Sequence, residues 1–221
     1  MSLDAPEYGA AVSCSFSALP LVPLSFSLHP LVDRFSDLDT LLDHIWTYVA
    51  DASTNAQHPF RTPTFGTVGT DAPRLRTVVL RTADREARML GFHTDRRSQK
   101  IEQIRGTPRI VWQGWDPERS EQFRLRGTAS IHTDDDVADA LWTAASDEER
   151  RLYRRPTAPG TPTEAPEHGL DESAPGRPHF AAIRTVIDEI NWLHLHPDGH
   201  YRAHFRYHSV QNDWDGQWIV P

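Results

Sequence analysis

The chain has 221 residues, which suits one domain with a short extension and is too few for two full-sized domains. Hydrophobic residues make up 38% of it, and 7 Trp, 9 Phe and 5 Tyr can fill a core, so a wholly disordered chain is excluded. The formal net charge of −8 would repel a polyphosphate backbone, so we expect no nucleic-acid partner. The single cysteine, Cys14, cannot form an internal disulfide, which indicates a cytoplasmic protein.

Prolines divide the start of the chain, at Pro20, Pro23 and Pro30. No apolar run reaches the about 18 residues that a membrane span needs. The basic start, apolar run and small-residue cleavage site of a secretory signal are also missing. We therefore expect an N-terminal arm over residues 1–30, a domain over residues 31–221, and no association with a membrane.

The first predicted element of this domain is a helix. Apolar residues at helical spacing predict it over residues 38–49, and Ser36 or Asp37 can cap it. Short β-rich runs separated by turn residues follow, and they predict an antiparallel meander. These runs lie at residues 64–68, 75–82 and 89–94.

Further along, a short helix is predicted over residues 97–105 because the Gly-Thr-Pro sequence at 106–108 ends it. Alternating patterns predict strands at residues 109–115 and 122–132, and an acidic start predicts one helix over residues 134–153.

Residues 155–179 contain six of the 17 prolines and predict a loop. The last strands are expected at residues 182–196, 200–208 and 214–220. About six or seven strands with a few helices predict a mainly β fold, a small antiparallel β-barrel with peripheral helices.

Arginines are unusually frequent in the run at 75–82 and just before it. Arg74 and Arg76 would lie on one face of the predicted strand and Arg81 on the other. Buried arginines need partners, and a solvated edge strand with ion pairs would also account for this pattern.

A second polar group lies where the next strand ends and a helix begins. Thr94, Ser98 and Lys100 would meet the free backbone N–H groups of the helix start, which makes a sound phosphate site. An ordinary capped helix with surface charges has the same pattern.

Two later strands alternate between an apolar and a polar face. In the strand at 122–132, Gln122 shares the polar face and could offer its amide to a flat polar ligand. In the strand at 200–208, Arg202, His204 and Arg206 share one face. By itself, Gln122 is better explained as a surface residue. We interpret the polar face of the later strand as a binding surface, with a solvated basic face as the alternative.

Five motifs stand in register along the chain: R-T-V-V-L-R at 76–81, H-T-D-R-R-S-Q-K at 93–100, E-Q-F-R-L-R-G at 121–127, I-N-W at 190–192 and R-A-H-F-R at 202–206. Together they resemble the pyridoxamine 5′-phosphate oxidase family of FMN-binding split barrels. Their order and spacing agree with the family over residues 58–221. The segment at 153–160 looks like a branch of the superfamily whose members are called FMN-binding or oxidase-related proteins.

The resemblance implies FMN as the cofactor. The first motif would line it with Arg76, Thr77, Val78, Val79, Leu80 and Arg81. The second motif would contribute His93, Thr94, Ser98, Gln99 and Lys100, with Lys100 and Arg76 toward the phosphate. Gln122, Trp192 and Arg206 would approach from neighbouring elements.

In the family the site lies between two subunits, so the resemblance implies a homodimer in which Trp192 and Arg206 reach the partner's FMN. It also implies a small-molecule substrate, contacted by Arg81, Arg155, Arg202 and His204.

Several positions depart from the family pattern. Gln99 replaces an arginine near the phosphate, and Arg81 replaces a lysine that contacts both cofactor and substrate. If Arg155 matches the arginine of the family's substrate-phosphate site, Arg151 and Pro159 stand where a tyrosine and a serine would hold the substrate phosphate. We therefore expect the phosphate site of the substrate to be incomplete.

The predicted function is that of an FMN-dependent oxidoreductase in which the flavin carries the chemistry, so no side chain is assigned as catalytic. Two alternatives remain: a flavin reductase acting on another small molecule, and a non-catalytic split barrel that stores FMN or handles haem. The histidines of the last hairpin motivate the haem alternative. A metal site among them is disfavoured because Pro197-Asp198-Gly199 breaks helical spacing.

Overall fold

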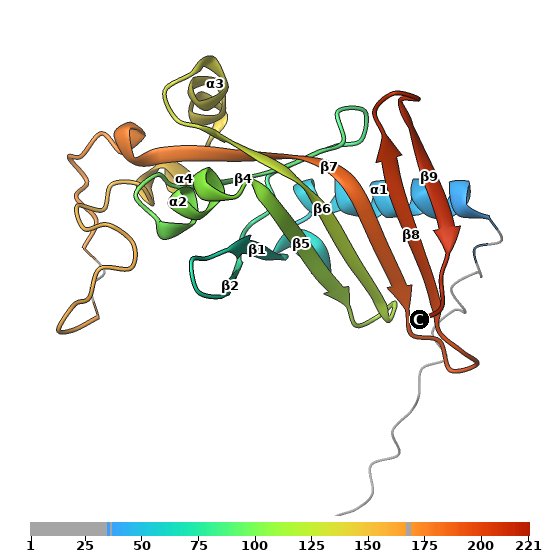
Figure 1. Ribbon diagram of the computed structural model, residues 1–221. Helices are drawn as coiled ribbons and strands as arrows, with labels where there is room; N and C mark the ends of the chain where they lie inside the picture. Colours follow the sequence, from blue (N-terminus) through green and yellow to red (C-terminus); the bar gives the residue numbers. More distant parts are fainter. Residues whose placement is uncertain (1–34, 36, 167–168) are drawn as a thin grey trace, which may run out of the picture. The chain divides into compact units, whose positions relative to one another are not determined.

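The computed structural model describes residues 35, 37–166 and 169–221, so the arm expected at 1–30 lies outside the described residues. In the described part, nine strands form one antiparallel sheet accompanied by four α-helices (Figure 1). The strands are β1 Thr64–Val68, β2 Pro73–Thr77, β3 Thr82–Asp84, β4 Met89–Asp95, β5 Arg109–Asp116, β6 Glu121–His132, β7 Phe180–His194, β8 Tyr201–His208 and β9 Asp213–Trp218. The helices are α1 Leu38–Thr54, α2 Gln99–Gly106, α3 Asp136–Ala144 and α4 Asp147–Arg151, with short 3-10 turns η1 Pro59–Arg61 and η2 Arg177–His179.

The long strand β7 organises the sheet. One of its edges pairs with β6, and the other pairs first with β4 through residues 180–186 and then with β8 through residues 189–194. Neighbouring strands in the sheet follow the order β2-β1-β5-β6-β7-β4-β3. Off this path, β8 pairs with β7, and β9 pairs with β8. The fold is therefore mainly β and antiparallel, as predicted, and the described strands do not close into a complete barrel.

Residues 78–81 bridge the two ends of this path. The N–H groups of Val78 and Leu80 donate to the carbonyls of Pro63 and Arg61, and the N–H of Arg81 donates to Gly91 of β4. The single strand predicted over 75–82 is therefore wrong: β2 ends at Thr77 and β3 begins at Thr82. The predicted meander is also wrong, because β2 and β3 lie at opposite ends of the path.

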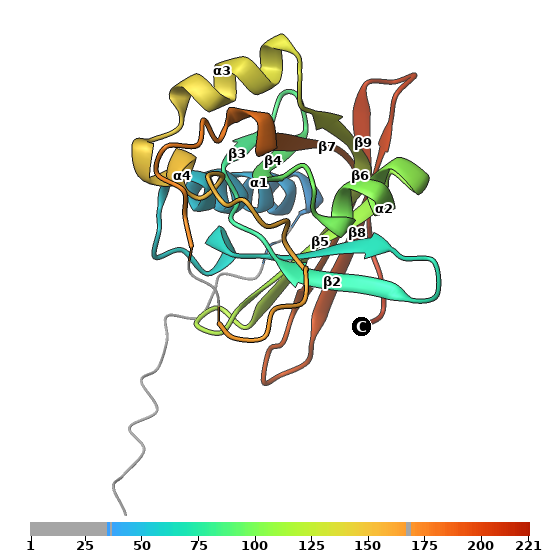
Figure 2. The same ribbon diagram turned by 90° about the vertical axis from the view of Figure 1, so that its left-hand side faces the viewer.

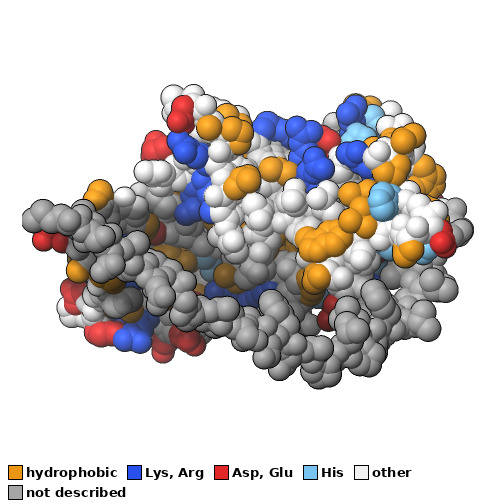
Figure 3. All heavy atoms as spheres, turned by 90° about the horizontal axis from the view of Figure 1, so that it is seen from below, with side chains coloured by type: hydrophobic (Ala, Val, Ile, Leu, Met, Phe, Trp, Pro, Cys, Tyr) orange, Lys and Arg blue, Asp and Glu red, His pale blue; other side chains and the backbone are white. Residues whose placement is uncertain are grey.

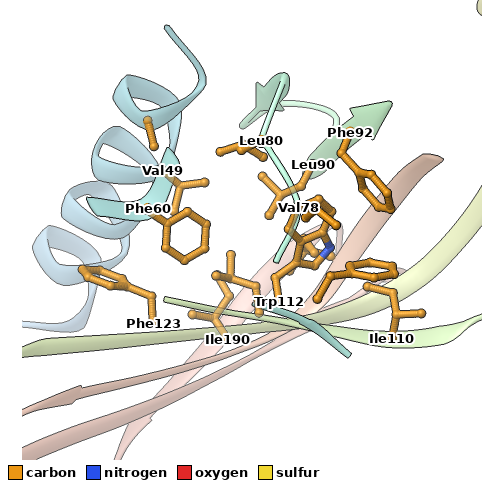
Figure 4. Packing of buried hydrophobic residues seen from close by; sticks show 14 of the residues in the cluster. Val49, Phe60, Val78, Leu80, Leu90, Phe92, Ile110, Trp112, Phe123 and Ile190 are labelled. Atoms are coloured by element: carbon orange, nitrogen blue, oxygen red, sulfur yellow. The ribbon is translucent and has the colours of Figure 1, made fainter. Parts of the chain in front are cut away.

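The main core lies between α1 and the sheet. Val78 and Leu80 point into it together with Val49, Phe60 and Trp112 (Figure 4). Asp37 caps α1 by accepting from Thr40 N at 2.7 Å, which confirms the predicted helix and extends it to Thr54.

A smaller cluster joins α3 to the start of β7 (Figure 2). It contains Ala138, Tyr153, Phe180 and Ala182, with Leu141 and Trp142 packed against them. The single helix predicted over 134–153 is wrong, because Ser146 interrupts it and begins α4 with a reciprocal capping box to Glu149.

Candidate functional site

A group of polar side chains gathers at the start of α2. The ammonium of Lys100 donates to the hydroxyls of Thr94 at 2.9 Å and Ser98 at 3.0 Å. Ser98 is the N-cap of α2, yet its hydroxyl accepts no bond from the helix backbone. Both hydroxyl residues are buried, at 8% and 6% exposure. The start of α2 therefore combines a cation, two hydroxyls and a helix N-terminus.

Arg76 completes this group from β2. Its guanidinium donates to Thr67 Oγ1 at 2.6 Å and to Gln103 Oε1 at 2.8 Å, and the Thr67 hydroxyl also bonds to Gln103, at 2.7 Å. We call Thr67, Arg76, Thr94, Ser98, Lys100 and Gln103 the phosphate cradle. Its members come from β1, β2, β4 and α2, so the sheet and one helix fix it jointly.

The cradle is electrostatically positive. Burial, and next the charge of Arg76, lower the pKa of Lys100 to about 8, against an opposing effect of Asp95. Burial and then Arg74 lower the pKa of Arg76. In the described part of the chain, no carboxylate forms an ion pair with either cation, and Asp95 is held by Arg97. The cradle thus fits an anion that can neutralise two adjacent cations.

Lys100 is also the only lysine in the sequence, since the other 22 basic residues are arginines. Unlike a guanidinium, an ammonium is a compact charge with three donors, and two of them are used on Thr94 and Ser98. A tetrahedral oxyanion suits such a point donor beside the forked Arg76.

Beyond Arg76, the side chains of residues 77–81 alternate between buried and exposed positions. Val78 and Leu80 are buried, while Thr77 and Val79 are exposed, Val79 at 39%. The segment therefore offers one outward edge that leads from the cradle to Arg81. Five extended residues span at most about 18 Å, enough for a ligand with a phosphate at one end and a flat ring at the other.

Arg81 lies at the far end of this edge and pairs with Glu149 of α4. Both line a pocket of about 250 Å³, together with Ser53, Arg61, His93 and Leu141. Burial, and next the charge of Arg81, lower the pKa of His93 to about 4, so this imidazole is neutral at pH 7. Its Nε2 is buried with no hydrogen-bond partner among the described residues.

The remaining predicted site residues lie elsewhere on the chain. Gln99 lines a second pocket of about 450 Å³ with Gln103 and Arg74, next to the cradle. Gln122 is half-buried on β6, opposite Trp115. Arg155 lines a separate small pocket with Pro159, so it does not share the Arg81 pocket.

The structure does not bring Trp192 and Arg206 together within one chain. Trp192 is 1% exposed and lies on the core face of β7, where its indole N–H has no partner in the described residues. Arg206 is exposed on the opposite face of β8. His204 and Arg202 share that face, with His204 bonded to Glu189 at 3.2 Å and Arg202 to Asn191 at 3.3 Å.

Three residues of these sites are absent from the sequence-based prediction. Gln103 lies one turn after Lys100, so helical spacing could have found it. Thr67 meets Arg76 only through the β1–β2 pairing, and Glu149 meets Arg81 only through the packing of α4. No local signal marks either of these long-range contacts.

Comparisons relate the chain to proteins of known family and fold. Residues 43–133 match the family model described as "Pyridoxamine 5′-phosphate oxidase, FMN-binding domain". A curated relative, "Pyridoxine/pyridoxamine 5′-phosphate oxidase 2" of Arabidopsis thaliana, is 27% identical over 134 residues, or 56% of this chain and 67% of the relative.

Two solved structures share the fold. A pyridoxamine 5′-phosphate oxidase-related, FMN-binding protein from Nostoc punctiforme has a TM-score of 0.68 and 24% identity, covering 80% of this chain and 96% of that one. PhzG from Burkholderia lata 383, in complex with tetrahydrophenazine-1-carboxylic acid, has a TM-score of 0.61 and 19% identity, covering 86% and 95%.

The chain thus shares the fold of these two proteins. The resemblance to the pyridoxamine 5′-phosphate oxidase-related family that the motifs predicted is confirmed.

Two further observations concern the described residues alone. No helix there is long and apolar enough to span a membrane. No group of three or more His, Cys, Asp or Glu side chains is arranged there to hold a metal ion, the histidines near the last hairpin included.

Proposed function

We propose that the protein is an FMN-dependent oxidoreductase of the pyridoxamine 5′-phosphate oxidase type. The observation that carries the proposal is the phosphate cradle, in which Lys100 and Arg76 lie close together and neither has a carboxylate partner among the described residues. Two adjacent cations without a counter-charge are unfavourable unless an anion binds them. The family match over residues 43–133 supports FMN as the source of that anion.

In this proposal, the cradle and residues 77–81 would each hold a different part of FMN. Lys100, Arg76 and the hydroxyls of Thr94 and Ser98 would bind the phosphate. The outward edge of residues 77–81 would lie along the cofactor toward Arg81. Bound FMN supplies the redox chemistry by accepting a hydride, while the protein orients the substrate and shields it from water.

The homodimer remains part of this proposal. Val79, Trp115 and Leu195 are 39–44% exposed, and hydrophobic side chains lie among basic ones on the face seen from below (Figure 3). Burying such side chains against a second copy would be favourable. Arg206, exposed on β8, is free to reach a partner's cofactor in such a dimer.

FMN titration of the apo protein tests the proposal. Arg76→Ala and Lys100→Ala should each weaken FMN binding about ten- to a hundred-fold, because a hydrogen bond to a charged group contributes roughly 1.5–3 kcal/mol. Arg105→Ala is the control: it removes an exposed arginine near the end of α2 that pairs with exposed Glu102, and it should leave FMN binding unchanged. If both cradle variants bind FMN like the parent protein, the proposal is wrong.

A further inference from the structure

Glu149 stands at the position from which an anionic group of a ligand would contact Arg81. Its carboxylate pairs with the Arg81 guanidinium, and both side chains are 26% exposed at the rim of the 250 Å³ pocket. An arginine in a half-buried pocket normally serves as a bidentate anion site. Here a side chain of the same chain already fills that role.

The carboxylate is held in place from two sides. One of its oxygens accepts from Ser146 N at 3.0 Å, as part of the capping box that begins α4, and the other pairs with Arg81. Burial raises the pKa of Glu149, but the Ser146 bond and the charge of Arg81 outweigh it and keep the pKa below its usual value. Glu149 is therefore ionised at neutral pH and positioned by its own helix.

No other basic residue that lines the pocket replaces Arg81 as an anion-binding group. Arg61 donates to the carbonyls of Leu80, at 2.7 Å, and Ser53. It is thus used to tie the bridging segment to the end of α1. His93 is uncharged at pH 7. An incoming phosphate would meet the Glu149 carboxylate before it could bond to Arg81.

We propose that Glu149 is a specificity-determining residue that excludes phosphate and other anionic groups from the Arg81 pocket and admits substrates whose group there is neutral or cationic. The inference rests on the proposed function, because Arg81 ends the edge along which FMN would lie. It adds to that function the class of substrate that the pocket accepts.

Binding of inorganic phosphate to the FMN-saturated protein, measured by calorimetry, tests this inference. Glu149→Gln keeps the capping box, since a glutamine can serve there, but removes the charge. It should bind phosphate about tenfold more tightly than the parent, because Arg81 then regains a charged acceptor. Glu148→Gln is the matched control: it makes the same charge change on the same helix at an exposed residue and should leave the affinity unchanged.

Further arms separate the possible results. The double variant Arg81→Gln/Glu149→Gln should lose the gain, and pyridoxamine 5′-phosphate should gain affinity in Glu149→Gln while unphosphorylated pyridoxamine should not. Equal phosphate affinity in Glu149→Gln and the parent, or an equal gain in Glu148→Gln, would overturn the role of Glu149. FMN binding by the parent and by each variant is measured in a separate titration. A parent protein that fails to bind FMN would contradict the proposed function, whereas normal FMN binding with no gain in phosphate affinity would contradict the role of Glu149 alone.

Discussion

The Lys100 ammonium lies 3.0 Å from the hydroxyl of Ser98, the residue that caps the same helix. A serine at this position usually accepts a bond from the helix backbone. In this protein it bonds to Lys100 instead, so its side chain does not cap the first turn of α2. The contact thus uses the usual capping group to hold the lysine.

The lowered pKa of Lys100 predicts how FMN affinity depends on pH. The pKa of Lys100 is lowered from 10.5 to about 8, so the free protein loses this charge as pH rises through 8. Phosphate monoesters are dianionic above about pH 6 and prefer the protonated amine. Affinity should therefore be highest between about pH 6 and 8 and fall by up to about tenfold per unit above that range.

Isotope-labelled lysine allows a direct measurement, because only one lysine side chain gives a signal. Its NMR titration should have a midpoint near 8 in the apo protein and a higher one with FMN bound. Lys100→Arg keeps its charge and should show a flatter affinity profile. An apo midpoint near 10.5 together with pH-independent affinity would contradict the prediction.

Substitutions of Gly127 and Gly106 by alanine should change the free energy of unfolding by different amounts. It lies at the bulge where the β6–β7 register shifts, and a Cβ there would be 2.1 Å from the carbonyl oxygen of Val186. Gly127→Ala should lower the free energy of unfolding by about 1–3 kcal/mol, because the backbone must move. Gly106→Ala, at the end of α2 with nothing within 4 Å, should be neutral or stabilising by about 0.5–1 kcal/mol. Urea unfolding measures both, and similar midpoints would refute the argument.

FMN binding that depends on the dimer is the third prediction. If Arg206 reaches the partner's cofactor, dilution that separates the subunits should release FMN. Light scattering combined with flavin fluorescence follows both events in one sample. A monomer that retains one FMN per chain would rule out a shared site.

Turnover of pyridoxamine 5′-phosphate is the fourth prediction. Arg151, where the family has a tyrosine, pairs with Glu172, and Pro159 has no hydroxyl for a phosphate. Losing two neutral hydrogen bonds would weaken binding by roughly 1–3 kcal/mol, and a misplaced reacting carbon would slow the reaction further. We expect little or no oxidation beside an authentic oxidase, measured by peroxide release at saturating substrate. Comparable rates would show that other residues hold the phosphate.

Local patterns predicted much of this fold. The spacing of apolar residues located α1, and strict alternation located β5, β6 and β8, because these elements present one face to the core. The same alternation placed Arg202, His204 and Arg206 together on one face of β8. Motif spacing placed Lys100, Thr94 and Ser98 near one another, as the structure has them.

Long-range contacts set the limit of that prediction. The sequence pattern of residues 78–81 predicts a strand. Their N–H groups instead donate to the carbonyls of Arg61, Pro63 and Gly91, so these residues lie outside the β1–β2 hairpin. Trp192 is 1% exposed and packs in the core of this chain. Neither outcome depends on neighbouring residues in the sequence, so no local pattern could reveal it.

The pairing of β4 with β7 also sets an order of events during folding. All six cradle residues lie from position 67 to position 103, yet β4 is held by residues 180–186, with Met89 opposite Val186. Loop closure over such a separation is slow, and during synthesis β7 emerges long after β4. The anion site should therefore mature late, after an interval in which β4 has an unpaired edge that is prone to aggregation. Refolding monitored by flavin binding should lag behind refolding monitored by helix formation.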